Sequence, residues 1–508
     1  MKAIGSVACA VGVLILGASE ASARKDNVLD VVCPWEIGST DATKSGHVFR
    51  WMSISETLVG VEPDGSMKPL LATAWSVDDS RLVWRFKIRE GVKFHNGKPL
   101  TAAAAAFSLN AARGKPGVLA KAPIREIAAD GDDLVVRLNE PFSPLPSLFT
   151  HASSQILEAA SYDADGNTVK VIGTGPFAIT LLQTPQRLAA RTFADYWGPK
   201  PAAEGVTYLA APRSETRTLM VQSGDADLAF NMDAASLKRL EMTAPVKGFS
   251  IPVARTVTLK LNAARPGLDT ARGRNAVNAA IDRRGIAASI LREPKSLANQ
   301  QFSPMFGDWF VDGLPQFRYD PKFTRSEFEA MGWSADVDGY LAKDGKRLSL
   351  TLTTFSDRPE LPIIATSIQE SLRQAGIEAK VSVNNSSAIP AGHHDGSLDM
   401  GMLARNYGVV RDPFVVMAED FRSGGGDWGA MNWSNAELDG MIAQMKASDG
   451  GPAYKTLSQR AARIIHEEMP VIPVAWHVQT VAVSRELDNF ALDPFQLSWN
   501  LEKVTWAK

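Results

Sequence analysis

The stretch LVWRFKIREGVKFHNGKPLTAAAAAF, residues 82 to 107, contains the local signals of a strand, a tight turn and the start of a helix. Large apolar side chains stand at every second position from Leu82 to Ile88, which is typical of a strand with one buried face and one exposed face. Asn96-Gly97 supplies a pair of residues that tolerates positive φ, and Thr101 is placed to cap the alanine-rich helix that follows. We therefore expect a strand, a turn and a helix in this order.

The first residues have the features of a secretory signal. Lys2 provides the basic start, residues 7 to 18 form a short apolar run, and Ala21-Ser22-Ala23 matches a small-residue cleavage pattern. The run is shorter than the roughly 20 apolar residues that a membrane-spanning helix needs. We therefore expect residues 1 to 23 to be a cleavable signal peptide and the mature protein to be free in the periplasm.

Length and charge set further bounds. A chain of 508 residues exceeds the roughly 250 to 300 residues at which one core usually divides, so at least two domains are expected. Its 54 basic and 56 acidic residues are nearly balanced, which offers no basic field for nucleic acid. Loss of Cys9 with the signal peptide would leave Cys33 alone, so the core has to stabilise the fold without an intramolecular disulfide.

An α/β unit is clearest in the second half of the chain. Leucines at every second position from Leu348 to Leu352 predict a strand, and apolar residues on one face from Ile364 to Ala375 predict a helix. Gly376 suits the left-handed residue at a helix end, and the alternation from Ile377 to Val383 predicts the next strand. The helix connects the two strands, so they should be parallel neighbours.

Further phrases occur in a characteristic order around these regions. They are SETLVGVEPDGSMKPLLATAW (55 to 75), IGTGPF (172 to 177), DYWG (195 to 198), GDADL (224 to 228) and LNAARPGLDTARGRNAVNAAIDR (261 to 283). Together with residues 82 to 107 they resemble the extracytoplasmic solute-binding proteins of ABC importers, family 5, the branch that carries dipeptides, oligopeptides and nickel. The resemblance covers nearly all of the chain after residue 23.

The resemblance implies an α/β protein with a two-lobed periplasmic-binding-protein fold, hinge crossings and an extra subdomain inserted in the first lobe. Lobe I is expected at residues 24 to 258 with the inserted subdomain at about 62 to 171, lobe II at 259 to 484, and a return to lobe I at 485 to 508, with crossings near 255 to 262 and 481 to 489. It also implies a partner, an ABC permease in the inner membrane with its ATPase. We expect a monomer that binds no nucleic acid.

The sequence lacks the common catalytic motifs. It has no G-x-S-x-G elbow, and His466-Glu467-Glu468 lacks the second histidine of a zinc-protease helix. Gly97-Lys98 lacks the upstream glycine of a phosphate-binding loop. Adjacent carboxylates such as Asp78-Asp79 are typical of solvated surfaces. We therefore expect no enzyme, no catalytic residue, no cofactor and no metal ligand.

One candidate binding region follows the predicted strand at 348 to 354. Phe355-Ser356-Asp357-Arg358-Pro359 stands at the carboxyl end of this strand, where ligands sit in open α/β sheets. Arg358-Pro359 resembles the Arg-Pro step with which dipeptide-binding members hold a peptide's terminal carboxylate. A planar guanidinium suits this role because it matches a carboxylate bidentately. The alternative is that Arg358 forms a surface or interdomain salt bridge.

A second candidate region, residues 403 to 414, reads as a strand that ends in a loop. The candidate ligand-binding residues here are Arg405, Asn406, Tyr407, Arg411 and Asp412. In peptide-binding relatives an Asp-containing loop at this place receives the peptide's amino group, but this chain has Val409 where the amine-binding Asp would align. The two added arginines favour ligands with more negative charge than a plain dipeptide. The alternatives are that Asp412 caps the following helix and that Tyr407 belongs to the core.

Trp35, Glu36 and Trp51 are candidates for the facing wall in the first lobe. Two tryptophans would strip water from a ligand, and the carboxylate would meet a cationic group. The alternatives are two core tryptophans and a solvated glutamate. We keep all three as candidate ligand-binding residues.

The nickel-binding branch gives the main alternative for the ligand. There a histidine follows the Asp-Pro step, and this position is Phe414 here. His393-His394-Asp395 has residue types that bind metals, but adjacent histidines in a glycine-flanked loop are typical of an exposed polar segment. A peptide or peptide-like solute is therefore the first prediction. The second is nickel or a metal chelate of the metallophore or opine kind, whose carboxylates the arginines would bind, and an enzyme or a periplasmic chaperone is less favoured.

Overall fold

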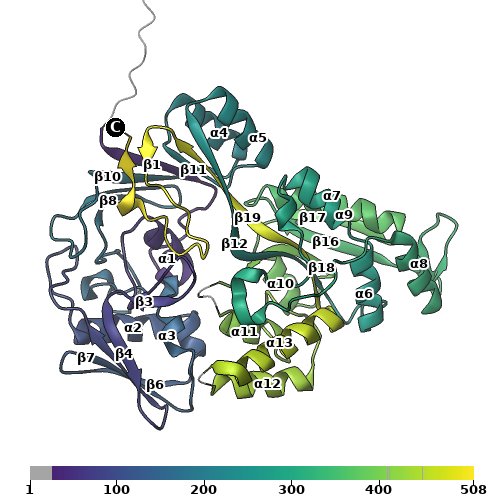
Figure 1. The fold of residues 1–508 in the computed structure, drawn as a ribbon, viewed down its shortest axis with the longest axis horizontal. Helices are drawn as coiled ribbons and strands as arrows, with labels where there is room; N and C mark the ends of the chain where they lie inside the picture. Colours follow the sequence, from purple (N-terminus) through teal and green to yellow (C-terminus); the bar gives the residue numbers. More distant parts are fainter. Residues whose placement is uncertain (1–25, 409, 411, 449, 508) are drawn as a thin grey trace, which may run out of the picture.

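The computed structural model describes residues 26 to 408, 410, 412 to 448 and 450 to 507. It has two halves, drawn in purple and blue on the left of Figure 1 and in green on the right. Lobe I is the half that contains β1 (Val28–Cys33), and lobe II is the half that contains β16 (Ser349–Phe355). The predicted signal peptide lies outside the described residues.

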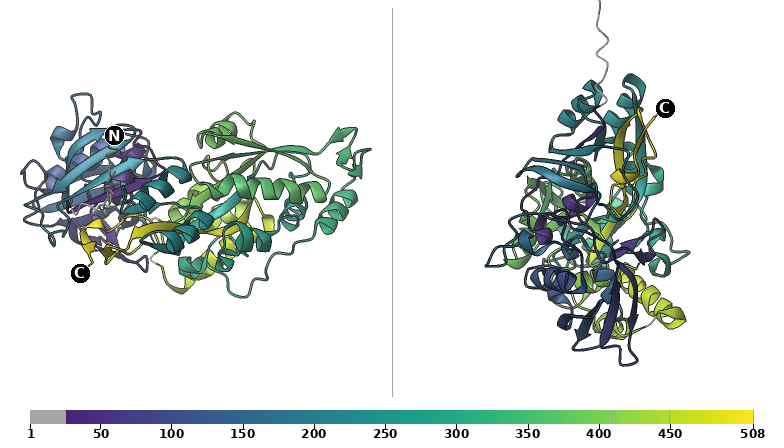
Figure 2. Two further views of the ribbon diagram at one scale, coloured as in Figure 1. Left: turned by 90° about the horizontal axis from the view of Figure 1, so that it is seen from above. Right: turned by 90° about the vertical axis from the view of Figure 1, so that its left-hand side faces the viewer.

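One mixed sheet continues through both lobes. Within the described residues it has ten strands in the order β17-β16-β18-β12-β19-β11-β1-β10-β9-β8. The other bounds are β8 (Phe177–Gln183), β9 (Arg187–Thr192), β10 (Gly205–Ala210), β11 (Leu228–Phe230), β12 (Val246–Leu261), β17 (Glu378–Asn384), β18 (Met400–Asn406) and β19 (Val471–Ser484). The two longest strands, β12 and β19, stand at the centre of this order and pass between the lobes (Figures 1 and 2).

The central strands change partners between the lobes. β12 and β19 are antiparallel, and their register shifts between Pro252 and Thr256. After this shift β12 pairs with β18 of lobe II, whereas the far end of β19 pairs with β11 of lobe I. Pro252 has no N–H to donate to the ladder, and the regular pairing of β12 with β19 is interrupted directly after it. The residue-level lobe boundaries expected from the sequence remain a prediction.

The inserted part of lobe I is a separate four-stranded sheet in the order β4-β5-β7-β6. Its bounds are β4 (Ala72–Val77), β5 (Val83–Ile88), β6 (Ile124–Asp130) and β7 (Asp133–Leu138), with α2 (Ala102–Arg113) against β6 and β7. The predicted strand, turn and helix are confirmed here. Gly97 has φ +83°, and the Thr101 side chain accepts a hydrogen bond from the N–H of Ala104.

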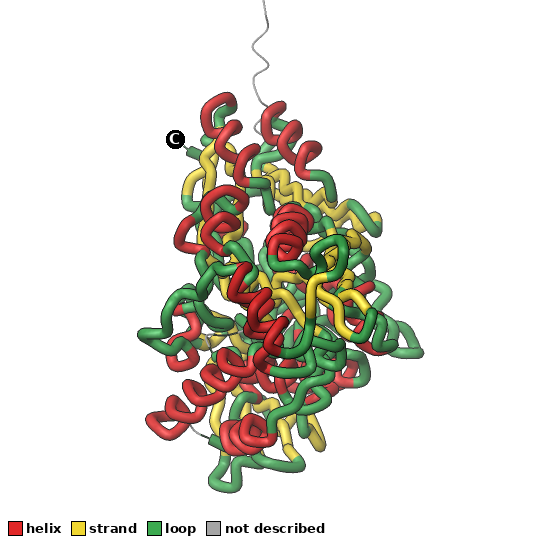
Figure 3. Tube along the Cα trace, turned by 90° about the vertical axis from the view of Figure 1, so that its right-hand side faces the viewer, coloured by secondary structure: helices red, strands yellow, loops and turns green. Residues whose placement is uncertain are grey.

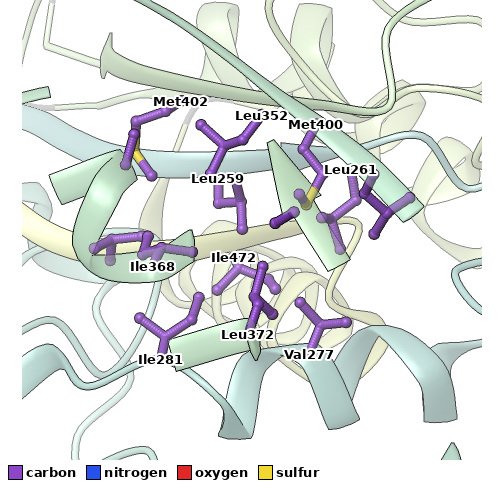
Figure 4. Close-up of a cluster of buried hydrophobic side chains, with 14 of the residues drawn as sticks. Leu259, Leu261, Val277, Ile281, Leu352, Ile368, Leu372, Met400, Met402 and Ile472 are labelled. Atoms are coloured by element: carbon purple, nitrogen blue, oxygen red, sulfur yellow. The ribbon is translucent and has the colours of Figure 1, made fainter. Parts of the chain in front are cut away.

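The predicted α/β unit of lobe II is also confirmed. β16 and β17 are parallel, α9 (Glu360–Gln374) connects them, and Gly376 has φ +86°. Ile368 and Leu372 of α9 pack with Leu259, Leu352 and other buried side chains in the core of this lobe (Figure 4). Seen from the side of lobe II, helices lie in front of the sheet (Figure 3).

The remaining elements complete the two lobes. The helices of lobe I are α1 (Ala42–Trp51), α3 (Leu145–Leu148), α4 (Ser214–Ser223) and α5 (Ala234–Thr243). Those of lobe II are α6 (Ala271–Ala279), α7 (Arg283–Gly285), α8 (Pro321–Ala330), α10 (Ala388–His394), α11 (Phe414–Phe421), α12 (Ala436–Lys446) and α13 (Gly451–Glu468). The short strands are β2 (Val59–Val61), β3 (Met67–Pro69), β13 (Ser334–Ala335), β14 (Leu341–Lys343), β15 (Lys346–Arg347), β20 (Leu487–Asp488) and β21 (Thr505–Trp506). Among the residues that the structure describes, none of the helices has the length and apolar character that a bilayer crossing requires.

A buried carboxyl joins three of the family-like phrases. Glu56, from SETLVG, accepts hydrogen bonds from Thr174 of IGTGPF at 2.8 Å and from Tyr196 and Trp197 of DYWG at 3.2 and 3.0 Å. The glycines of IGTGPF allow this approach, since a Cβ on Gly173 would lie 2.3 Å from a backbone oxygen of the segment before Glu56. These phrases therefore build one contact inside lobe I.

Folding stability should depend on pH through Glu56. Burial raises the pKa of its carboxyl from 4.5 to about 7, against the opposing effect of its three hydrogen-bond donors. The folded protein then binds the proton more tightly than the unfolded chain, so this contribution is complete below pH 4.5 and is lost as pH rises through about 7. A difference of one pKa unit between the folded and unfolded states corresponds to about 1.4 kcal/mol, so we expect the free energy of unfolding to fall by about 3 kcal/mol as pH rises across this range.

Urea denaturation of the wild type and of Glu56→Gln at a series of pH values measures this dependence. The difference between the two unfolding free energies should change with pH in the stated direction, while Glu62→Gln, an exposed neighbour that pairs with Lys68, should follow the wild type. A pH-independent difference between the wild type and Glu56→Gln would show that the carboxyl titrates alike in both states.

Candidate ligand-binding site

The two lobes touch along the inserted subdomain. Lys121 and Glu140 of this subdomain form ion pairs with Glu419 and Lys446 of lobe II, respectively. Close to the central strands, Asn231 at the end of β11 donates a hydrogen bond to the backbone oxygen of Asp357 at 3.3 Å. Contacts therefore join the lobes both at the inserted subdomain and close to the central strands.

Arg358 lies at this boundary, in the turn between β16 and α9. It is only 7% exposed, and its Nη1 donates to Nε2 of His477 on β19 at 3.1 Å. On its other side the guanidinium lies 5.6 Å from the ring centroid of Trp35, which follows β1 in lobe I. Burial lowers the pKa of Arg358, and the charges of Glu360 and Asp357 oppose this effect. The predicted arginine is thus in contact with the facing lobe.

The guanidinium of Arg358 keeps unused donors. Among the described residues, Nε and Nη2 have no hydrogen-bond acceptor, and no carboxylate lies within ion-pair distance of the group. Almost all buried polar groups in proteins have such a partner. This edge of Arg358 is therefore available to a bound carboxylate.

A second cation, Arg255, lies on β12 where this strand enters lobe II. Its Nη1 donates to the backbone oxygen of Ala404 at 2.7 Å, and its Nε donates to Oε1 of Gln496 at 3.1 Å. Burial and then the nearby charges of Arg358 and Arg405 lower the pKa of Arg255 well below its usual range. Sequence reasoning did not identify Arg255 as a site residue, although it begins the segment expected to cross between the lobes.

Aromatic side chains form the wall in lobe I. The ring centroids of Trp35 and Trp51 are 5.0 Å apart, and those of Trp51 and Trp499 are 4.8 Å apart in a stacked arrangement. Trp51 also donates from Nε1 to the backbone oxygen of Gln496 at 2.8 Å. Both predicted tryptophans are half-buried and belong to one aromatic group, whereas Glu36 is exposed.

Most predicted residues of the second region have partners inside lobe II. Arg405 donates from Nε and Nη2 to the two carboxylate oxygens of Asp420, both at 2.7 Å. Tyr407 is buried, and its hydroxyl accepts from Gln301 at 3.0 Å. Asp412 accepts from the first N–H of α11 at 2.9 Å. These contacts match the capping and core alternatives for Asp412 and Tyr407.

The other residues of this region give less information. Asn406 is half-buried, and its side-chain oxygen accepts from the N–H of Gly408 at 2.9 Å. Arg411 and Val409 lie outside the described residues. Next to this loop a cavity of about 470 Å³ separates lobe II from the inserted subdomain, with Trp84 on one side and Tyr454 on the other. The boundary between lobe II and the inserted subdomain is therefore hollowed at this edge.

The paired histidines of α10 contact lobe II itself. His393 is hydrogen-bonded to Lys260 and to the backbone oxygen of Asp427, and Nε2 of exposed His394 lies 3.0 Å from the Asp427 carboxylate. Within the described part of the chain, no three or more His, Cys, Asp or Glu side chains are grouped so that they could hold a metal ion.

Comparison with known proteins identifies the family that this architecture resembles. The model of the family "Bacterial extracellular solute-binding proteins, family 5 Middle" matches residues 66–428. The nickel-binding periplasmic protein of Escherichia coli K12 is 25% identical over 482 residues, 91% of each chain, and the glutathione-binding protein GsiB of the same strain is 24% identical over 468 residues, 87% of each chain.

Solved structures share the fold. NikA from Brucella suis, in complex with Fe(III)-EDTA, superposes with a TM-score of 0.83 at 22% identity and covers 94% of this chain and 100% of its own. The oligopeptide-binding protein AppA from Bacillus subtilis, in complex with a nonapeptide, gives 0.82 at 22% identity, with 94% and 99% covered. The expected two-lobed fold is confirmed, and the chain belongs to family 5 of the bacterial extracellular solute-binding proteins, the solute receptors of ABC importers.

Proposed function

We propose that this protein captures a carboxylate-bearing peptide or peptide-like solute between its lobes in the periplasm and delivers it to an ABC permease without changing it chemically. The observation that carries the proposal is the buried guanidinium of Arg358, which contacts the facing lobe and keeps Nε and Nη2 without an acceptor among the described residues. A carboxylate matches this pair of parallel donors.

The geometry also suits capture by closure. Arg358 and Arg255 come from lobe II and β12, whereas Trp35 and Trp51 come from lobe I, so a bound solute would contact both halves. Such contacts favour the closed state over the open one, which is a shift of population. Arg405, Tyr407 and Asp412 would support the loop that follows β18 through their contacts inside lobe II.

A metal chelate is the second candidate. The relative that is 25% identical over 91% of this chain is a nickel-binding protein, and NikA from Staphylococcus aureus was solved with Ni(L-His)2 at a TM-score of 0.82. A chelator carries carboxylates of its own, and these would meet Arg358 and Arg255 in the same way as a peptide carboxylate. The two candidates therefore share one site and differ in the mass and metal content of the solute.

Native mass spectrometry of the protein purified from periplasm tests the proposal. We expect a retained solute whose mass identifies a peptide or a chelate, and metal analysis of the same sample separates the two. Incubation of the released solute with fresh protein should return it unchanged. Absence of any retained solute, together with scattering curves that stay the same when periplasmic extract is added, would contradict the proposal.

A further inference from the structure

A buried histidine and a glutamate stand behind the arginine that faces the solute. His477 is 2% exposed, and its two ring nitrogens point to different partners, with Nε2 at 3.1 Å from Nη1 of Arg358 and Nδ1 at 3.4 Å from Oε1 of Glu360. We propose that His477 and Glu360 are positioning residues, which hold the guanidinium of Arg358 so that its free edge meets the carboxylate of the solute. This inference rests on the proposed function.

The hydrogen bond between Arg358 and His477 determines which ring nitrogen of the histidine carries the proton. A guanidinium has donors only, so Nε2 of His477 must accept the hydrogen bond from Arg358. Nε2 then carries no proton, and the neutral ring has its proton on Nδ1, which faces Glu360. Among the described residues, neither Nδ1 of His477 nor Oε1 of Glu360 has a hydrogen-bond partner, and the two atoms approach each other at 3.4 Å without hydrogen-bond geometry.

Burial and the positive charges nearby disfavour the charged form of this histidine. Burial, followed by the charges of Arg358 and Arg255, places the pKa of His477 well below its usual range. The charged groups around it are these two arginines together with Glu360 and Asp357. Burial raises the pKa of Glu360, while Arg358 opposes this effect. An imidazolium at His477 would face two guanidinium groups and could no longer accept from Arg358.

A neutral partner has a specific advantage at this position. Arg405 shows the other arrangement, since Asp420 occupies two of its nitrogens and balances its charge. At Arg358 an imidazole accepts from one nitrogen of the guanidinium and leaves Nε and Nη2 without an acceptor among the described residues, while the charges of Glu360 and Asp357 act from beyond ion-pair distance. The same protein thus has one arginine that is neutralised inside lobe II and one that is held ready for an external anion.

The state of the ring is tested in the wild-type protein without a ligand. Long-range ¹H–¹⁵N NMR spectra of histidine-labelled protein distinguish the two neutral tautomers and the imidazolium, and His477 is assigned from the signal lost in His477→Gln. We expect a neutral ring protonated on Nδ1 between pH 5 and pH 8. An Nε2-protonated ring, or an imidazolium at pH 7, would overturn the inference.

Variants test the positioning role with glutathione and with the solute found by native mass spectrometry as probes. His477→Leu removes the acceptor and should lower affinity by about ten- to a hundredfold, the range for a hydrogen bond to a charged group. His477→Gln keeps an acceptor at the place of Nε2 and should restore most of the affinity. His466→Leu, on α13 and outside the site, is the matched control. A C-terminal amide of the probe should bind alike to the wild type and to His477→Leu.

The outcomes separate this inference from the proposed function. Loss of binding in Arg358→Ala with full binding in a folded His477→Leu would reject the positioning role alone. Equal binding of both variants and the wild type would reject the carboxylate site itself. Equal losses for the acid and the amide probe would show that His477 acts only on folding, which circular dichroism of each variant checks.

Discussion

Replacement of Arg358 by alanine should lower the affinity for a carboxylate-bearing solute by about 2 to 5 kcal/mol, the range for truncation of one partner in a buried charge pair. At about 1.4 kcal/mol for each tenfold change, this corresponds to a loss of about thirtyfold to several thousandfold. The reason is that the carboxylate would enter the space between the lobes and find no bidentate donor. Nε2 of His477 would also lose the hydrogen bond that it accepts from Arg358.

Isothermal titration calorimetry with the solute identified by mass spectrometry measures this loss. Arg358→Lys is the informative companion, because it keeps the charge but replaces the planar fork with a single ammonium group, so its affinity should fall between those of the wild type and Arg358→Ala. Trp35→Phe keeps a ring beside the guanidinium and should have a smaller effect. If Arg358→Ala binds the solute as tightly as the wild type, Arg358 is a structural interdomain residue and the ligand is held elsewhere.

Local signals explain why much of the fold could be predicted from the sequence. Alternating apolar residues defined β5, and the helix after it begins behind Thr101 as expected. The unit around α9 was equally clear, since a strand, an amphipathic helix, a glycine at its end and a second strand follow one another within residues 348 to 383. These features depend on residues close in sequence, where periodicity and turn chemistry decide the structure.

The site was only partly predictable because its contacts join distant residues. Arg358 was a candidate because it lies shortly after a strand, where ligands bind, and because Arg358-Pro359 resembles the Arg-Pro step of dipeptide-binding relatives. His477 lies 119 positions further along the chain, inside a mostly apolar strand whose sequence gives no sign of its contact with Arg358. Trp499 reaches the aromatic wall from the C-terminal return, which carries no motif.

Arg405 illustrates the opposite difficulty. The sequence shows a cation at the end of a strand near the predicted site, and this position favoured a ligand contact. Its partner Asp420 lies 15 residues later on α11, and only the fold brings the two side chains together. Two arginines of similar sequence context therefore differ in their partners, which side-chain geometry alone reveals.

Loss of this internal pair should destabilise lobe II. Asp420 is fully buried and holds Arg405 through two hydrogen bonds of 2.7 Å, so Asp420→Ala would leave a guanidinium without its counter-charge. Removal of one partner from a buried pair costs about 3 to 5 kcal/mol. The Arg405 side chain is 20% exposed, so water can reach part of the freed charge. We therefore expect the free energy of unfolding, measured by urea denaturation, to fall by about 3 kcal/mol.

A matched surface pair in the same lobe tests whether burial is the cause. Arg460 forms the same bidentate pair with Glu437, with hydrogen bonds of 2.7 and 2.9 Å, but the two side chains are 43% and 52% exposed. Glu437→Ala should therefore cost less than about 1 kcal/mol. The double variant Arg405→Met, Asp420→Leu should recover much of the stability lost in Asp420→Ala, because it removes both charges together. Equal losses in Asp420→Ala and Glu437→Ala would mean that the buried pair is solvated, and Arg405 would then be free to meet an anionic solute after all.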